Sequence, residues 1–205
     1  MMKLVVLTSE KEVKNEADVL NTLFAHGLTT LHLRKPLLEI EGYRQLLELI
    51  NPEYYRRIIL HDDHELCGEY GLRGIHLQEQ ARMDLGAKLL SYVNGYRSNN
   101  YSVSSSFHQP EEIENCVAKF DYVLLSPVFD SISKKDYEGK GFNVRHIKAL
   151  VVGMGGVNEK TVQKTFNLGY RGAGVLGGIW NSEDYLESFL AIQKSCNNIV
   201  KLEAL

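Results

Sequence analysis

The run Val151-Val152-Gly153-Met154-Gly155-Gly156 has the pattern of a buried strand that leads into a glycine-rich turn. A second run, Gly172-Ala173-Gly174-Val175-Leu176-Gly177-Gly178-Ile179, repeats this pattern further along the chain. Glycine in such a turn leaves backbone N–H groups open to an anion, because a side chain would hold the anion away. In a barrel of alternating strands and helices, the turns after the seventh and eighth strands form a phosphate site of this kind. Taken singly, each run is equally compatible with a tight turn that binds nothing.

Outward from these runs, strand-like and helix-like segments alternate along the chain. The predicted strands are residues 3–7, 29–34, 57–61, 73–77, 101–105, 121–125, 150–154 and 172–176. The predicted helices are Asn15–His26, Ile40–Ile50, Pro110–Phe120, Glu159–Leu168 and Glu183–Ser195, with the weakest helical pattern over 83–100. This alternation predicts a single (β/α)₈ TIM barrel over residues 1–205, and an open doubly wound sheet is the competing architecture.

Composition narrows the class of protein. The chain has 205 residues and a formal net charge of -3, which argues against a protein that coats nucleic acid. No apolar run has the length of a membrane span or of a signal peptide. The three cysteines are far apart and lack metal-site spacing. We therefore expect a cytoplasmic protein with reduced cysteines, no nucleic-acid partner and no membrane partner, and a homodimer is compatible with the sequence.

Polar residues fall on the inward-facing positions of several strands. Alternation predicts that Leu31 and Leu33 face the helices. The side chains expected to face inward, near the carboxyl ends of neighbouring strands, are His32, Arg34, His61, His76 and Gln78. Barrel active sites lie at that end. His108 follows the fifth strand, and the long connection from Ser126 to Phe142 has the length of a lid or binding loop.

Each candidate side chain has a functional and a structural interpretation. Arg34 can bind a phosphate bidentately or form an ion pair at the barrel mouth. Asp62 can hold Mg²⁺ or cap the following helix. Lys134 can close over a phosphate or lie in solvent. His108 can act as a general acid or base, or cap a helix. His32, His61 and His76 can form a metal site, but interior histidines are more commonly satisfied by their neighbours.

Several motifs, taken in order, point to one family. They are Leu31-His32-Leu33-Arg34-Lys35, Leu60-His61-Asp62-Asp63, Gly74-Ile75-His76-Leu77-Gln78, Ser104-Ser105-Ser106-Phe107-His108, Asp121–Phe129 with Ser131-Ile132-Ser133-Lys134-Lys135, and Gly153-Met154-Gly155-Gly156-Val157. Over nearly its whole length the chain resembles the thiamin phosphate synthase family, which includes related thiazole tautomerases. The resemblance implies a (β/α)₈ barrel enzyme of thiamin biosynthesis.

The chain departs from the synthase pattern at several positions. The synthases join a pyrimidine pyrophosphate to a thiazole phosphate and hold Mg²⁺ on two carboxylates. Here the glutamine position of strand two is His32, the asparagine position after strand three is His61, and the second carboxylate position is Ala81. The serine position of the last turn is Gly177. The tautomerases move a proton within the thiazole product and need no metal, and they resemble this chain in their His-x-Arg pattern and in the run Glu138-Gly139-Lys140-Gly141.

We therefore expect an enzyme that binds a thiazole phosphate, with tautomerase-type proton transfer narrowly preferred. The alternatives are the synthase reaction, with a pyrimidine pyrophosphate as second substrate, and a non-catalytic ligand-binding or partner protein. The expected catalytic residues are His108, His32 and Lys134. The expected substrate contacts are Arg34, His61, Ser104, Ser131, Ser133, Gly155, Gly156, Gly177 and Gly178. The tautomerase reaction needs no cofactor, whereas the synthase reaction would use Mg²⁺ on Asp62. We also expect valine at Gly156 or Gly178 to leave the fold intact and to weaken phosphate binding.

Overall fold

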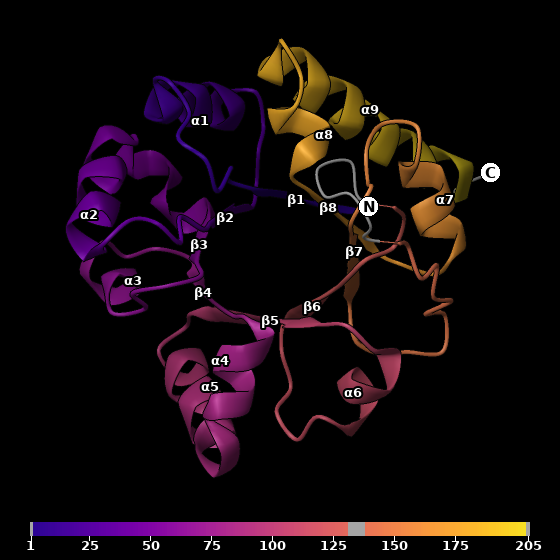
Figure 1. Cartoon of the computed structure of the whole chain (residues 1–205), viewed down its shortest axis with the longest axis horizontal. Helices are drawn as coiled ribbons and strands as arrows, with labels where there is room; N and C mark the ends of the chain where they lie inside the picture. The colour runs from indigo at the N-terminus through magenta and orange to yellow at the C-terminus, as the bar shows by residue number, and fades with distance from the viewer. Residues whose placement is uncertain (1, 131–137, 204–205) are drawn as a thin grey trace.

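Eight short parallel strands pair in sequence order and close into a barrel (Figure 1). The computed structural model describes the backbone of residues 2–130 and 138–203. The strands are β1 (Lys3–Leu7), β2 (Leu31–Leu33), β3 (Ile58–Leu60), β4 (Gly74–Leu77), β5 (Ser102–Phe107), β6 (Tyr122–Leu125), β7 (Val151–Met154) and β8 (Gly172–Val175). Pairing of β1 with both β2 and β8 completes the ring. The TIM barrel predicted from the alternation of strands and helices is confirmed, and the open sheet is excluded.

Helices surround the barrel and follow most strands (Figure 1). They are α1 (Glu16–Ala25), α2 (Ile40–Leu49), α3 (Leu66–Glu69), α4 (Glu79–Asp84), α5 (Leu89–Ser98), α6 (Pro110–Asn115), α7 (Val162–Asn167), α8 (Gly177–Trp180) and α9 (Tyr185–Glu203), with 3₁₀ turns at Pro52–Arg57 and Gly86–Lys88. The predicted helix Pro110–Phe120 was too long, because the backbone becomes extended at Cys116. Between β6 and β7, residues 126–130 and 138–150 form no helix.

The barrel interior has an apolar half and a polar half. On the apolar side, Val5, Leu7, Leu124 and Val152 pack together with the ring of Tyr122. On the other side, β2 to β5 bring buried histidine and serine side chains inward, namely His32, His61, His76 and Ser104. The leucines that alternate with His32 on β2 pack in the cluster between the sheet and the helices, as predicted. Buried polar groups destabilise a fold unless they are hydrogen-bonded, so the partners of the polar half determine what it can do.

None of the helices in the described part of the chain combines the length and the apolar character needed to cross a bilayer.

Candidate active site

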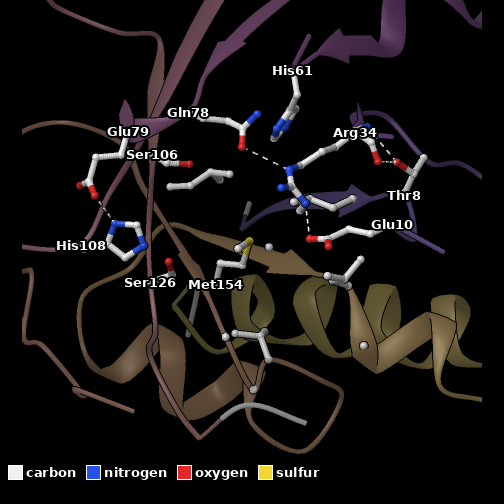
Figure 2. Close-up of a pocket in the computed structure, with 18 of the residues that line it drawn as sticks. Thr8, Glu10, Arg34, His61, Gln78, Glu79, Ser106, His108, Ser126 and Met154 are labelled. Atoms are coloured by element: carbon white, nitrogen blue, oxygen red, sulfur yellow. Dashed lines mark hydrogen bonds and ion pairs between the residues drawn. The ribbon is translucent and has the colours of Figure 1, made fainter. Parts of the chain in front are cut away.

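A cavity of about 360 Å³ opens at the carboxyl ends of the strands. Residues that follow or end different strands form its walls, including Thr8, Arg34, His61 and Ser106 (Figure 2). The glycine-rich turns after β7 and β8 form another part of the wall. The cavity therefore lies at the end of the barrel where the sequence predicted that polar side chains gather.

His108 and Glu79 form a pair on one wall of this cavity (Figure 2). His108 Nδ1 lies 2.9 Å from Glu79 Oε2. An ionised carboxylate only accepts hydrogen bonds, so the imidazole donates from Nδ1. In the neutral imidazole, Nε2 is then a free acceptor. Arg82 Nη2 lies 3.7 Å from Glu79 Oε1 and adds a cation on the far side of the carboxylate. A carboxylate that orients an imidazole in this way is typical of a general base.

Arg34 also reaches the cavity, but its guanidinium already has partners. Its Nη1 contacts the carboxylate of Glu10, and its Nε donates to Gln78 Oε1 at 3.3 Å (Figure 2). Thr8 Oγ1 accepts from the Arg34 amide at 2.8 Å and donates to the Arg34 carbonyl at 2.9 Å, which holds this end of β2 in place. An anion that binds Arg34 must therefore compete with Glu10.

Removing the carboxylate of Glu10 should release Arg34 for anions. In Glu10→Gln we expect the affinity for inorganic pyrophosphate to rise by a factor of about 1.4 to 5, because an exposed ion pair is worth about 0.2–1 kcal/mol. Calorimetry at low salt measures this change. The matched control is Glu69→Gln, which removes an ion pair to Arg44 of similar exposure outside the cavity. Equal affinities in Glu10→Gln and the unmodified protein would show that Arg34 does not bind the anion.

The turns after β7 and β8 present backbone, rather than side chains, to the cavity. Gly155 and Gly156 have φ angles of +98° and +64°, and Gly177 and Gly178 are the first residues of α8. No acceptor within residues 2–130 and 138–203 takes a hydrogen bond from the N–H groups of these glycines. Unpaired N–H groups in a cavity wall are what a phosphate group requires. The role of these glycines as phosphate contacts stays a prediction.

The expectation that a side chain at Gly156 would leave the fold intact was wrong. A Cβ there would lie 2.5 Å from the Asp130 carbonyl oxygen and 2.7 Å from Phe129 Cβ, at a left-handed φ. At Gly178, a Cβ would lie 2.8 Å from the Val157 carbonyl oxygen. Binding data from variants at these glycines would therefore mix lost contacts with altered packing.

Gly156→Ala should lower the free energy of unfolding by about 2–5 kcal/mol, since left-handed strain of about 1–2 kcal/mol adds to overpacking of about 1–3 kcal/mol. Gly141→Ala is the control, because Gly141 has a φ of +55° but its Cβ would meet nothing within 4 Å. The control should lose only the strain contribution. Urea denaturation of both variants measures the difference, and equal losses would contradict the packing argument.

Beneath the cavity, His32 connects His61 to Tyr122. Its Nδ1 lies 2.8 Å from His61 Nε2, and its Nε2 lies 2.5 Å from the Tyr122 hydroxyl. Burial lowers the pKa of His32 and of His61 well below the usual value, and the neighbouring His76 adds to both effects. Burial also raises the pKa of the Tyr122 phenol. All three side chains are therefore neutral near pH 7.

His76 joins the same interior from β4. Its Nδ1 lies 2.8 Å from Ser104 Oγ, and its Nε2 lies 2.7 Å from Ser106 Oγ. Burial lowers the pKa of His76 to about 3, and the charges of His64 and Arg34 act in the same direction. The Ser106 hydroxyl thus connects this buried imidazole to the wall of the cavity.

The ligand-atom positions of His32, His61 and His76 lie within 4.8 Å of one another, so the metal site considered above was a reasonable hypothesis. The ring orientations do not suit it. The rings of His61 and His76 are stacked, with centroids 4.2 Å apart and planes at 26°. Imidazole binds a metal through a lone pair in the ring plane, and stacked rings do not direct their lone pairs to one nearby point. The hydrogen bonds of His32 and His76 also engage both nitrogens of each ring.

The structure brings only part of the predicted site to the cavity. Arg34, His61, His108 and the glycine turns line it. His32 and Ser104 are fully buried below it, whereas Ser106 and Ser126 reach the wall. The remaining predicted residues, Ser131, Ser133 and Lys134, lie outside the described residues. Sequence reasoning assigned no role to Glu79 as a partner of His108, although its position directly after Gln78 at the end of β4 was a usable signal.

The carboxylates near the cavity do not form a pair suited to Mg²⁺. Asp62 Oδ1 accepts from Gln78 Nε2 at 3.2 Å, and Asp62 Oδ2 accepts from the Tyr43 hydroxyl at 3.1 Å. Ala81 is exposed on α4 and offers no ligand, and the Glu79 carboxylate is held by His108. Mg²⁺ needs several oxygens in near-octahedral geometry. The residues present therefore do not fit the two-carboxylate site that the resemblance implies for the synthase reaction.

Known proteins similar to this chain belong to the family that its motifs resemble. Residues 4–179 match the sequence profile of a family described as thiamine monophosphate synthase. A thiamine-phosphate synthase of Lysinibacillus sphaericus is 26% identical over 94% of this chain and 93% of that protein. A crystal structure of a thiamine phosphate pyrophosphorylase from Bacteroides thetaiotaomicron superposes with a TM-score of 0.73 and 30% identity, covering 96% of this chain and 98% of that one. A pyrophosphorylase from Pyrococcus furiosus shares the fold with a TM-score of 0.72 at 19% identity, over 97% and 96% of the two chains.

Proposed function

This chain belongs to the thiamine monophosphate synthase family, enzymes of thiamin biosynthesis, and we propose that it moves a proton within a thiazole phosphate. The observation that supports this most is the contact of 2.9 Å between His108 Nδ1 and Glu79 Oε2 in the cavity wall. The contact leaves Nε2 of a neutral imidazole available to a ligand. General acid–base catalysis by such a group typically contributes about 10²–10⁴-fold to a rate.

The other walls of the cavity carry the groups that would bind the phosphate of this substrate. The phosphate would bind the free amides of Gly155, Gly156, Gly177 and Gly178, which present a positive potential without a metal. Arg34 would supply a cation once Glu10 is displaced. With the phosphate held at β7 and β8, the thiazole ring would lie toward β4 and β5, where His108 and Ser106 line the cavity.

The second candidate is the synthase reaction, in which a pyrimidine pyrophosphate and a thiazole phosphate are joined and pyrophosphate is released. The names of the relatives favour it, since they are thiamine-phosphate synthases. Within the described residues, Glu79 Oε1 is buried without a hydrogen-bond partner, but Arg82 Nη2 lies 3.7 Å from it, so a metal cation there would compete with this guanidinium. Arg34 would hold the pyrophosphate in that reaction, whereas the residues present do not fit the Mg²⁺ site of the synthases.

Two assays on the same purified protein separate the candidates. We expect isomerisation of the thiazole phosphate, followed by NMR, to proceed equally in EDTA and in Mg²⁺. We expect coupling to the pyrimidine pyrophosphate to be slow, and to increase in Ala81→Asp, which restores the second carboxylate. Mg²⁺-dependent coupling by the unmodified protein at an ordinary rate, on the order of 1 s⁻¹, would decide for the synthase reaction.

Binding of the thiazole phosphate without either reaction would instead indicate a non-catalytic ligand-binding protein, the third reading. In all three cases the expected partners are small molecules. The cysteines in the described part of the chain are unpaired, which suits the cytoplasmic location that we propose.

A further inference from the structure

The geometry points to His61 as a hydrogen-bond donor to the bound ligand, held in one tautomer by Tyr122 acting through His32. The inference rests on the proposed function for the reaction that it assists. The tautomer itself follows from the barrel interior alone. His61 would thus contact the ligand, whereas His32 and Tyr122 would position its proton from below.

The first step is the direction of the hydrogen bond from Tyr122. The Tyr122 hydroxyl lies 2.5 Å from His32 Nε2. His32 Nε2 is the hydrogen-bond partner that the described residues give this hydroxyl. The phenolic proton is therefore left for His32. A buried hydroxyl without an acceptor would cost about 1–3 kcal/mol, so Tyr122 donates and His32 Nε2 accepts.

The second step extends this hydrogen-bond direction from His32 to His61 at the cavity. A neutral imidazole has one N–H, so His32, which accepts at Nε2, carries its proton on Nδ1. That proton is donated to His61 Nε2 at 2.8 Å. His61 accepts at Nε2 in turn, and its own proton is on Nδ1. Tyr122 thus fixes the tautomer of His32, and His32 fixes the tautomer of His61.

The third step concerns His61, where this series of hydrogen bonds ends at the cavity. His61 lines the cavity and is only 5% exposed, and its Nδ1 has no hydrogen-bond partner among the described residues. A buried donor in this state is destabilising unless a ligand accepts from it. Figure 2 shows His61 and His108 on different walls of the same cavity. The two imidazoles can therefore address different atoms of one ligand.

This placement divides the reaction between two groups. His108 Nε2 takes a proton from the ligand, and the electron pair that is left moves toward the atom that accepts from His61 Nδ1–H. The His108 side chain is 38% exposed, so the proton it holds exchanges with solvent before His108 delivers a proton to a second atom of the ligand. One proton leaves the ligand and one returns, so the step balances. A neutral imidazole that donates to developing negative charge stabilises it without carrying a charge of its own.

The tautomers are measured by ¹⁵N NMR of protein labelled at histidine, without ligand. We expect His32 and His61 both to carry the proton on Nδ1. In Tyr122→Phe the donor to His32 is lost, and a fraction of the molecules should move the His32 proton to Nε2. Tyr170→Phe is the matched control, since the hydroxyl of Tyr170 is buried without a hydrogen-bond partner among the described residues. A proton on Nε2 of His61 in the unmodified protein, or an unchanged pattern in Tyr122→Phe, would overturn the inference.

Kinetics test the contact with the ligand. In His61→Asn a side-chain N–H donor remains, so kcat for isomerisation should fall less than about tenfold, whereas His61→Leu should lose about 10²-fold, with KM little changed in both. Equal losses would overturn the inference.

Absence of isomerisation by the unmodified protein would defeat the proposed function and leave the tautomer result standing. Zn²⁺ that shifts the ¹⁵N signals of all three interior histidines would show a metal site instead and would also overturn the inference.

Discussion

His108→Gln should lower turnover of saturating thiazole phosphate at least about tenfold, within the 10²–10⁴-fold range of general acid–base groups. The glutamine keeps a side chain that can contact Glu79, but it cannot accept a proton at neutral pH. Binding of the ligand should be retained, because the phosphate is expected on the glycine turns at another wall of the cavity. Initial rates followed by NMR, together with a separate binding measurement, give the two quantities.

The chain offers a matched control for this variant. His146 and Glu114 also form a histidine–carboxylate pair, with 3.9 Å between His146 Nε2 and Glu114 Oε2, but both are exposed and outside the cavity. His146→Gln should leave turnover unchanged. If His108→Gln also turns over normally, His108 is structural, and the base must be sought among the other groups that line the cavity.

The unmodified protein should lose about 2 kcal/mol of stability between pH 7.5 and pH 5 through His76, and His32 and His61 should change stability in the same direction. Burial depresses the pKa of each, so the unfolded chain binds more protons than the folded one below the ordinary pKa of about 6.5. Stability is therefore complete above about pH 6.5 and is lost as the pH falls toward the folded-state pKa, which is about 3 for His76. At pH 5 His76 contributes a loss of about 2 kcal/mol, because one pKa unit corresponds to about 1.36 kcal/mol.

A loss of about 2 kcal/mol or more is measurable against the roughly 5–15 kcal/mol that stabilises an ordinary domain. Urea unfolding at the two pH values measures it. His76→Gln, which can still bond a serine hydroxyl, should remove about 2 kcal/mol of this pH dependence. His26→Gln replaces an exposed histidine and should remove none. A stability that stays flat from pH 7.5 to pH 5 would show that the interior histidines are not neutral in the way the structure indicates.

The barrel and its inward-facing residues were predictable because they depend on local patterns. Alternation along β2 was enough to place Leu31 and Leu33 against the helices and His32 inside. The glycine pairs were enough to place two tight turns after β7 and β8. The positions of His61 and His108 in the cavity wall follow from the rule that residues after barrel strands meet at one end.

The partners of these residues were not predictable, because they depend on contacts between distant segments. Glu79 and His108 come from the ends of β4 and β5, and no spacing rule relates them. Lys35 was read as part of an anion motif, but its Nζ lies 2.6 Å from Glu16 Oε2, where both side chains are buried. Strand alternation stops after Arg34, so it could not show that the Lys35 ammonium turns toward α1 rather than the cavity.

The central step of the proposed reaction is proton transfer to and from the ligand without a metal. The direct measurement is the incorporation of deuterium from D₂O into the isomerised thiazole phosphate, followed by NMR in the presence of EDTA. We expect incorporation well above the rate without protein, and a fall of at least about tenfold in His108→Gln. Incorporation no faster than in buffer, together with Mg²⁺-dependent coupling to the pyrimidine pyrophosphate, would contradict the account.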